Sequence, residues 1–315
     1  MAGDEQPVLR HLLIPLDGSS LAECVLPIGF SLAAHLHAKV TLLHVMERGA
    51  PATVHGHRHL RLAPEAERYL AEVAARARAA GVEVESHVHP NLEGDVAKSI
   101  VGHAADFDAD LVILAAHGAG GAKRVLFGSV AQQVLRGGVP AVLLIRPPEG
   151  PADAKPVGPE PGRLLIPLDG QPSAEAALPV ACAIVRAYDT EVVLLRVVPT
   201  VTTIPGNRAS TARVLPTATA VSLELEEHEA RVYVERVAAD LRSQGIRVTA
   251  SVGRGEPAQG LLDGAAQAGA GMIVMATHGR TGLDAVFSGS VASRLVARFL
   301  RPILLVRAAR EDDSP

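Results

Sequence analysis

Two glycine-spaced segments of the chain share one pattern of residue types, Ala115–Val130 and Ala276–Val291. Each reads small residue, two residues, Gly, nine residues, then Gly-Ser-Val. Glycine allows a positive φ and leaves backbone N–H groups uncovered. If a helix follows, its first N–H groups are unpaired and carry partial positive charge, so together they can hold a phosphate. The spacing therefore predicts an anion site that needs no charged side chain.

An acidic residue accompanies each segment. Asp17 and Asp169 both follow a short apolar run in the sequence "LLIPLDG", and such a carboxylate can accept hydrogen bonds from ribose hydroxyls. Lys123 and Arg124 in the first half, and Arg280 in the second, could screen outer phosphates. Taken singly, Gly-Ser before a helix can be only a turn with a helix cap, and the Asp can be only a cap. Their joint repetition favours a mononucleotide pocket.

The pocket residues belong to a unit that is written twice. The run Leu12–Pro27 matches Leu164–Pro179, and the glycine segments match at a separation nine residues longer. The extra residues are expected between Pro199 and Glu229. Residues 147–162 are rich in Pro and Gly, which is typical of a linker. We therefore predict domains at 1–146 and 163–308, with a tail at 309–315.

Each half alternates short apolar runs with helical patterns. In the first half, strands are predicted at 12–16, 40–45, 82–88, 111–115 and 141–145, and helices at 21–36, 65–80, 96–105 and 129–135. In the second half, strands are predicted near Leu164, Val192, Arg247, Met272 and Ile303. Continuous apolar strands suit a parallel sheet covered on both faces. The predicted fold is two tandem doubly wound α/β domains, Rossmann-like or flavodoxin-like, each with a five-stranded parallel sheet.

That fold brings the chemical groups together. Ligands of such sheets bind beyond the carboxyl ends of the strands, where the winding reverses. A flavodoxin-like strand order places the first and fourth strands side by side at that reversal. The Asp after the first strand would then face the glycine segment after the fourth.

Composition excludes several classes of protein. Lys and Arg number 30 against 34 Asp and Glu, so no clustered basic face for nucleic acid is expected. The two cysteines, Cys24 and Cys182, are interpreted as small thiols in a reducing compartment. Without a long apolar run, the chain is predicted to be soluble and cytoplasmic, without membrane contact. It contains no Gly-Lys dipeptide, which a Walker A loop requires.

Histidines cluster at several places. His55, His57 and His59 alternate in a predicted loop, where a solvated loop is favoured over a metal site. His87 and His89 share one face of a predicted strand and are interpreted as structural. Two more, His117 and His278, precede the segment glycines and are expected to shape the backbone. No catalytic or metal-ligating residue is predicted.

From Leu9 to Arg146 and from Arg163 to Arg307, the sequence resembles the universal stress protein family in its tandem form. The family's signature is Gly, two residues, Gly, nine residues, Gly, then Ser or Thr. Its first glycine is Ala here, at Ala115 and Ala276, and one added methyl group could crowd the ribose. The resemblance and the residue pattern together imply these nucleotide-binding residues: Pro15, Asp17, Val45, Leu114, Ala115, Gly118, Gly128, Ser129, Val130, Pro167, Asp169, Val197, Met275, Ala276, Gly279, Arg280, Gly289, Ser290 and Val291.

The same resemblance implies ATP or AMP as the ligand, with or without Mg²⁺ and with no structural metal. It also implies binding without efficient turnover, in stress response or energy sensing. Dimers of the family are implied to form through the last strand, here Val142–Ile145 and Ile303–Val306, so the halves could pair with each other or form a homodimer. A weak ATPase and a scaffold with degenerate pockets remain alternatives. Thr277, Arg280 and Met275 match the family better than the first half does, so the second site is expected to bind more tightly.

Overall fold

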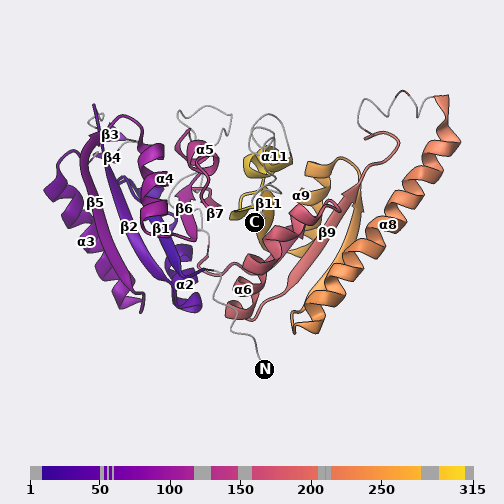
Figure 1. The fold of residues 1–315 in the computed structure, drawn as a ribbon, viewed down its shortest axis with the longest axis horizontal. Helices are drawn as coiled ribbons and strands as arrows, with labels where there is room; N and C mark the ends of the chain where they lie inside the picture. Colours follow the sequence, from indigo (N-terminus) through magenta and orange to yellow (C-terminus); the bar gives the residue numbers. More distant parts are fainter. Residues whose placement is uncertain are drawn as a thin grey trace, which may run out of the picture. The chain divides into compact units, whose positions relative to one another are not determined.

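The computed structural model describes the residues 9–49, 53–54, 57–58, 60–116, 129–147, 158–204, 210, 214–277 and 291–308. The chain divides into two compact units (Figure 1). The first holds residues 1–161 together with 300–307, and the second holds residues 162–299 and 308–315. No helix in these described ranges has the length and apolar character needed to cross a membrane.

The first unit is built on one mostly parallel sheet in the order β5-β2-β1-β6-β7-β12. Its strands are β1 (His11–Pro15), β2 (Lys39–Glu47), β5 (Val84–Glu93), β6 (Leu111–Ala115), β7 (Ala141–Ile145) and β12 (Ile303–Arg307). A separate two-stranded ribbon is formed by β3 (Thr53–Val54) and β4 (His57–Arg58). The helices are α1 (Ser20–Glu23), α2 (Leu26–Leu36), α3 (Ala63–Ala79), α4 (Val96–Asp106) and α5 (Ser129–Arg136).

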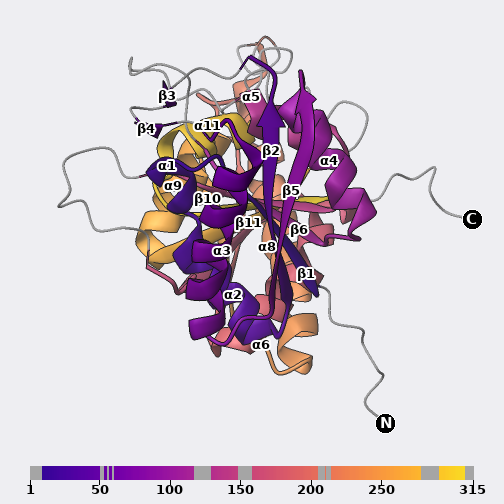
Figure 2. The same cartoon turned by 90° about the vertical axis from the view of Figure 1, so that its left-hand side faces the viewer.

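The winding of this sheet reverses once. From β1 the chain moves outward through β2 to β5, then returns to the other side of β1 and continues through β6 to β7. Because crossovers between parallel strands are right-handed, the reversal sends later helices to the opposite face. Accordingly, α2 and α3 lie on one side of the strands and α4 on the other (Figure 2). The reversal falls between β1 and β6, as the sequence predicted.

The second unit repeats this winding with the strand order β10-β9-β8-β11. Its strands are β8 (Arg163–Pro167), β9 (Val192–Val198), β10 (Val248–Arg254) and β11 (Ala270–Thr277). Its helices are the short η1 (Pro172–Ala177), α6 (Leu178–Tyr188), α8 (Pro216–Ser243), α9 (Pro257–Ala268) and α11 (Val291–Arg298). At 28 residues, α8 is longer than its 17-residue counterpart α3. Here too the first and fourth strands of the half, β8 and β11, are neighbours.

The core of each unit lies on both faces of its sheet. The central residues of β1, Leu12 to Ile14, are completely buried, which is why the strand is a continuous apolar run. Glycine permits the close approach of α2, because a Cβ at Gly29 would lie 2.9 Å from Cδ1 of Ile14. Close packing of this kind leaves little room for an added methyl group.

Apart from the β3–β4 ribbon, each half of the described chain contributes five strands, as the sequence predicted, and β12 is the fifth strand of the second half. β12 pairs antiparallel with β7, with Ile303 opposite Leu144 and Val306 opposite Ala141. The guanidinium of Arg307 also donates a 2.7 Å hydrogen bond to the carbonyl of Gly138. β12 therefore groups with the first unit.

We expect Leu305→Ala to lower the free energy of unfolding by about 2–5 kcal/mol, because this β12 side chain is 1% exposed. Leu300→Ala is the matched control, since Leu300 is 65% exposed and should change stability by less than about 0.5 kcal/mol. Denaturant titration followed by circular dichroism measures both. Equal stabilities of the two variants would contradict the placement of β12 in the core.

Candidate functional site

The turn after β1 contains the first candidate acid. Oδ1 of Asp17 accepts a 2.8 Å hydrogen bond from the backbone N–H of Ser19, and Gly18 between them has a φ of +85°. Ser19 in turn caps α1, because its hydroxyl accepts from the N–H of Ala22 at 3.1 Å. The carboxylate thus closes its own turn with one oxygen while the serine does the capping.

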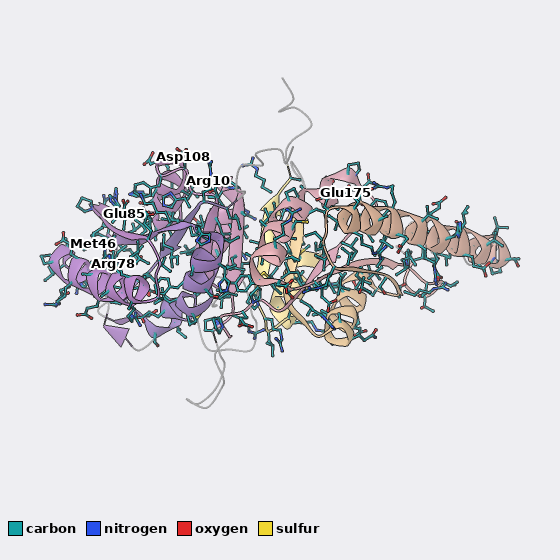
Figure 3. The ribbon with its side chains drawn as sticks, turned by 90° about the horizontal axis from the view of Figure 1, so that it is seen from below. Arg10, Met46, Arg78, Glu85, Asp108 and Glu175 are labelled. Carbon is teal, nitrogen blue, oxygen red and sulfur yellow. The ribbon has the colours of Figure 1, made fainter. Side chains whose placement is uncertain are left out.

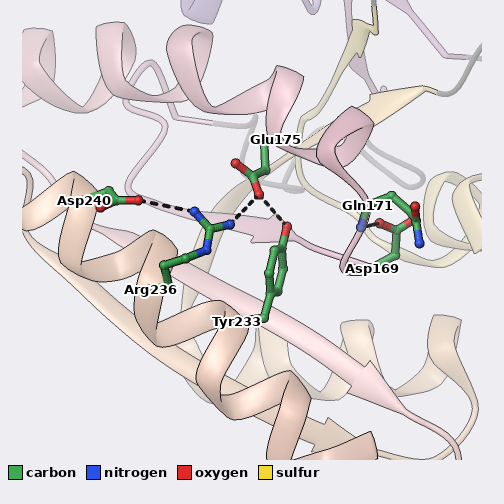
Figure 4. A network of polar contacts seen from close by, with 6 residues as sticks. All are labelled: Asp169, Gln171, Glu175, Tyr233, Arg236 and Asp240. Carbon is green, nitrogen blue, oxygen red and sulfur yellow. Dashed lines mark hydrogen bonds and ion pairs between the residues drawn. The ribbon is translucent and has the colours of Figure 1, made fainter. Parts of the chain in front are cut away.

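The second unit builds the same turn with different side chains. Oδ1 of Asp169 accepts from the N–H of Gln171 at 2.8 Å, and Gly170 has a φ of +92° (Figure 4). Asp169 is exposed, whereas Asp17 is half-buried. The repeat therefore reproduces a backbone turn that needs both an acceptor side chain and a glycine.

The candidate glycine segment of the first unit leaves from the neighbouring strand. β6 pairs with β1 in parallel, so both strands end at the same edge of the sheet. Ala115 ends β6, and the N–H of Ala116 donates to the carbonyl of Ile145 at 2.7 Å. Since α5 connects the parallel neighbours β6 and β7, its N-terminus at Ser129 faces the same edge as the end of β6.

Several predicted residues fall outside the described ranges. They are His117, Gly118, Lys123, Arg124 and Gly128 in the first half, and His278, Gly279, Arg280, Gly289 and Ser290 in the second. The side chain of Ser129 is likewise not described. The other members of the predicted set lie at or just beyond the carboxyl ends of their strands, or at the helix start in the case of Val130 and Val291.

The strand ends differ in exposure between the units. In the first unit two of the predicted nucleotide-binding residues are buried, Val45 at 8% exposure and Leu114 at 6%. Their counterparts Val197 and Met275 in the second unit are half-buried. Val197 also packs against α9, because its Cγ1 lies 2.8 Å from where a Cβ on Gly260 would stand. These strand ends are thus more exposed in the second unit than in the first.

A different side chain covers each turn. A Cβ at Gly18 would lie 2.8 Å from Cγ of Leu60, and one at Gly170 would lie 2.9 Å from Cζ of Arg196. An aliphatic group therefore lies against the first turn and a guanidinium against the second. Among the described residues, Arg196 forms no ion pair, and its Cζ lies 5.6 Å from the ring centroid of Tyr233. The guanidinium therefore places a positive charge at the second turn.

A polar network beside the second turn was missed by the sequence analysis. Oε1 of Glu175 accepts from the hydroxyl of Tyr233 and from Nη2 of Arg236, both at 2.9 Å (Figure 4). Figure 3 shows Glu175 beside α8, the helix that carries the tyrosine and the arginine. Arg236 also forms an ion pair with Asp240 at 3.4 Å. The network thus connects η1, the short helix that directly follows the turn, to α8.

The first unit has a related cluster. Nη2 of Arg76 contacts Oε2 of Glu23 at 2.7 Å, and Tyr69 lies near Glu23 and Asp17. The two glutamates follow "LDG" at the same distance in both halves, which is a sequence signal for their shared role. The tyrosines carry no such signal, because α3 and α8 differ in length.

Two tyrosines and one cysteine near the turns are held in their neutral forms. Burial, and then Glu175, raise the pKa of Tyr233, while burial and then Glu23 raise that of Tyr69. Burial also raises the pKa of Cys24 to about 12, and Cys182 is a buried free thiol. Both tyrosines and Cys24 therefore stay protonated at neutral pH, where neither hydroxyl nor thiol is an effective nucleophile.

Comparisons with known proteins agree on one family. The model of the universal stress protein family matches residues 9–146 and 161–307. A universal stress protein of Methanocaldococcus jannaschii is 28% identical over 150 residues, 48% of this chain and 84% of that protein. One of Mycolicibacterium smegmatis is 30% identical over 206 residues, 64% of this chain and 63% of that protein. The crystal structure of a universal stress protein from Archaeoglobus fulgidus shares the fold, with a TM-score of 0.67, 20% identity and coverage of 96% of this chain and 97% of that chain.

The contact between Gly170 and Arg196 can be measured by substitution. Gly170→Ala should destabilise the protein by about 1–2 kcal/mol for its positive φ and by a further amount for displacing the guanidinium. Gly245→Ala is the matched control, because Gly245 has a φ of +79° and open space around it. Denaturant unfolding of both variants, repeated in an Arg196→Ala background, isolates the contact. If Gly170→Ala cost no more than Gly245→Ala, Arg196 would not lie against the turn.

Proposed function

Because the chain belongs to the universal stress protein family, we propose that it binds adenine nucleotide, ATP or AMP, at the carboxyl edge of each sheet. Occupancy of these sites, rather than efficient turnover, would carry its role in stress response or energy sensing. A homodimer, or pairing of the halves within one chain, belongs to the same proposal. We also propose that the protein is soluble and cytoplasmic, and that its two domains span residues 1–146 and 163–308.

One observation carries this proposal. In both units the strand that precedes the Asp turn pairs in parallel with the strand that precedes the glycine segment. Parallel pairing brings Asp17 to the edge where β6 ends, and Asp169 to the edge where β11 ends. This is the reversal point at which doubly wound sheets bind ligands. The fold thus supports the placement of a ribose acceptor opposite a phosphate-type segment, twice.

The proposal assigns a role to each element of the site. The carboxylate of Asp17 or Asp169 accepts hydrogen bonds from ribose hydroxyls, while Oδ1 of each also closes its own turn. Val45 or Val197, at the end of the second strand of each half, contacts the adenine. Backbone N–H groups of the glycine segment and of the helix start bind phosphate oxygens. Mg²⁺, when present, would lie on the phosphates and would need no protein cage.

The described residues favour binding over hydrolysis. Each Asp carboxylate is engaged in its own turn, and Tyr69, Tyr233 and Cys24 remain protonated at neutral pH. A general base must instead be able to take a proton from water at the reacting phosphate. We therefore propose slow ATP hydrolysis at most.

The two sites should differ in strength. Arg196 brings a guanidinium to the second turn, where the first unit has the aliphatic Leu60. The residue that corresponds to Arg196 in β2 is His44, which is buried and bonds to the carbonyl of Leu16 at 2.8 Å. A nucleotide phosphate near the second turn would gain a charge-assisted hydrogen bond that the first turn cannot offer. We propose that the second site binds ATP more tightly.

Asp169→Asn should weaken ATP binding about tenfold, because it removes a charged acceptor whose hydrogen bond is worth about 1.5–3 kcal/mol. Asparagine can still accept from the N–H of Gln171, so the turn and the stability should persist. The control is Asp189→Asn. Asp189 lies at the end of α6, away from the carboxyl ends of the strands, and its carboxylate accepts a hydrogen bond from Arg247. Calorimetric titration with ATP and Mg²⁺ measures both. Absence of binding by the wild-type protein at millimolar ATP would refute the proposed function.

Arg196→Met should weaken the tighter of two ATP sites about tenfold and leave the weaker one unchanged. Arg247→Met is the control, because that arginine precedes β10 at the opposite edge of the sheet. Titrations that resolve two sites of unequal affinity provide the readout. A loss confined to the weaker site would contradict the assignment of the tighter site to the second unit.

A further inference from the structure

Three histidines of the first unit meet outside the proposed nucleotide crevice. His87 and His89 lie on β5, and His103 lies on α4. One ring nitrogen from each lies within 4.8 Å of the others. The sequence places the two strand histidines on one face, but only the fold adds the third from a helix. We propose that His87, His89 and His103 form a binding site for a divalent transition metal, with Zn²⁺ as the preferred ion.

The fold supplies this juxtaposition through two packing relations. β5 is the end strand of the sheet and pairs with β2, with Leu43 opposite His87 and Val45 opposite His89. Because α4 packs over β2 on the face opposite α2 and α3 (Figure 2), it brings His103 above that edge of the sheet. Alternate residues of a strand share a face, so both strand histidines can point to the helix. The two strand histidines are half-buried and His103 is buried.

The hydrogen bond of His103 to Ser99 leaves Nε2 of its ring for a metal. Its Nδ1 lies 2.9 Å from the carbonyl oxygen of Ser99, which can only accept, so Nδ1 must carry the proton. In the neutral ring Nε2 then has a lone pair, and it lies 3.0 Å from Nε2 of His87. Metal-bound histidines commonly donate their other N–H to a carbonyl in this way. Without metal, Nε2–H of His87 would donate to His103; with metal, that proton moves to Nδ1 of His87.

The distances are close to those of a tetrahedral site. Zn–N bonds of 2.0–2.1 Å place the ligand nitrogens about 3.3 Å apart. The separation of His87 and His103 is already 3.0 Å, and the remaining separations do not exceed 4.8 Å. Small rotations of the imidazole rings would bring the three nitrogens to these separations. Three neutral imidazoles leave a fourth position for water, which is the ligand set of an open zinc site.

Neighbouring groups hold the rings but do not compete for the metal. The ring of Phe107 meets those of His87 and His103 edge-to-face, with centroids 5.3 Å and 5.5 Å away. The ring of His11 also lies near that of Phe107, with centroids 6.4 Å apart, but both of its nitrogens are engaged, by the carbonyl of Phe107 and by Oγ1 of Thr41, each at 2.7 Å. Among the residues whose side chains the structure describes, these three histidines are the candidate ligands.

The second unit provides an internal comparison. Strand register aligns His87 with Ser251 and His89 with Gly253, because Val40 pairs with Val84 as Val192 pairs with Val248. The N-caps Asp95 and Glu256 align the two helices and place Gly264 where His103 stands. The same fold is thus built without any of the three histidines. The fold therefore does not require these histidines, and a structural role common to both halves does not account for their presence in the first unit.

The test uses the full chain without a histidine tag, freed of metal by chelation. Calorimetric titration with Zn²⁺ and visible spectroscopy with Co²⁺ measure affinity and geometry. We expect one tight site per chain and the intense visible absorption of tetrahedral Co²⁺. His89→Gln and His103→Gln should each weaken binding by more than the roughly 10–100-fold that loss of an outer hydrogen-bond partner costs.

Two controls separate this site from other histidines. His35→Gln should leave Zn²⁺ binding unchanged, although His35 bonds the carbonyl of Ser31 just as His103 bonds that of Ser99. Joint replacement of His55, His57 and His59 by Gln should also leave it unchanged. Circular dichroism shows whether each variant is folded. If replacement of the buried His103 prevents folding, the result for the half-buried His89→Gln decides the test. The proposal is overturned if the wild-type chain binds no Zn²⁺, if His89→Gln binds normally, or if the loop replacement abolishes binding.

Discussion

Parallel pairing between the first and fourth strands of each half is the constraint on which the rest of the structure depends. In the first unit it joins Leu12 to Leu111, and in the second it joins Leu164 to Met272. Parallel neighbours end at one edge, so the Asp turn and the glycine segment are brought together however far apart they lie in sequence. The buried, continuous apolar strands fix this register, because a shifted register would expose part of the core. A site at this edge is therefore a consequence of how the sheet is wound.

Duplication reproduced the frame and left the side chains free to diverge. Both turns keep an acceptor aspartate and a glycine in the left-handed region, since the backbone path requires them. The residue lying against the turn differs, Leu60 in one unit and Arg196 in the other. Outside the crevice the divergence is larger still, because three histidines of the first unit correspond to Ser251, Gly253 and Gly264. One fold can thus support two nucleotide sites of unequal strength and a separate metal site.

Much of the fold could be predicted from sequence, because local pattern determined it. The strands 111–115 and 141–145 were predicted with their observed bounds, and the reversal between the first and fourth strands followed from the doubly wound pattern. The placement of β12 in the first unit depends on long-range antiparallel pairing, for which a strand pattern carries no signal. The resemblance implied that last strands pair, but nothing in the sequence indicated that β12 would group with the first compact unit.

The site could be predicted only in part, for a similar physical reason. Asp17 and Asp169 stood out because they follow repeated apolar runs. The contact of Glu175 with Tyr233 could not be read from sequence, since it depends on where the long α8 crosses η1. The contact between His103 and His87 could not be predicted either, because it joins a helix to a strand. Contacts between elements are set by packing, and packing is not periodic in sequence.

Amide hydrogen exchange with and without ATP and Mg²⁺ tests most directly whether nucleotide binds at the shared edge of the strands. We predict slower exchange in the presence of ATP at the turn 169–171 and across 276–293, and unchanged exchange near 189–192, at the amino ends of the strands. Smaller but parallel protection is expected at 17–19 and 115–131. Binding of ATP that protects other segments and leaves these turns unaffected would contradict this prediction.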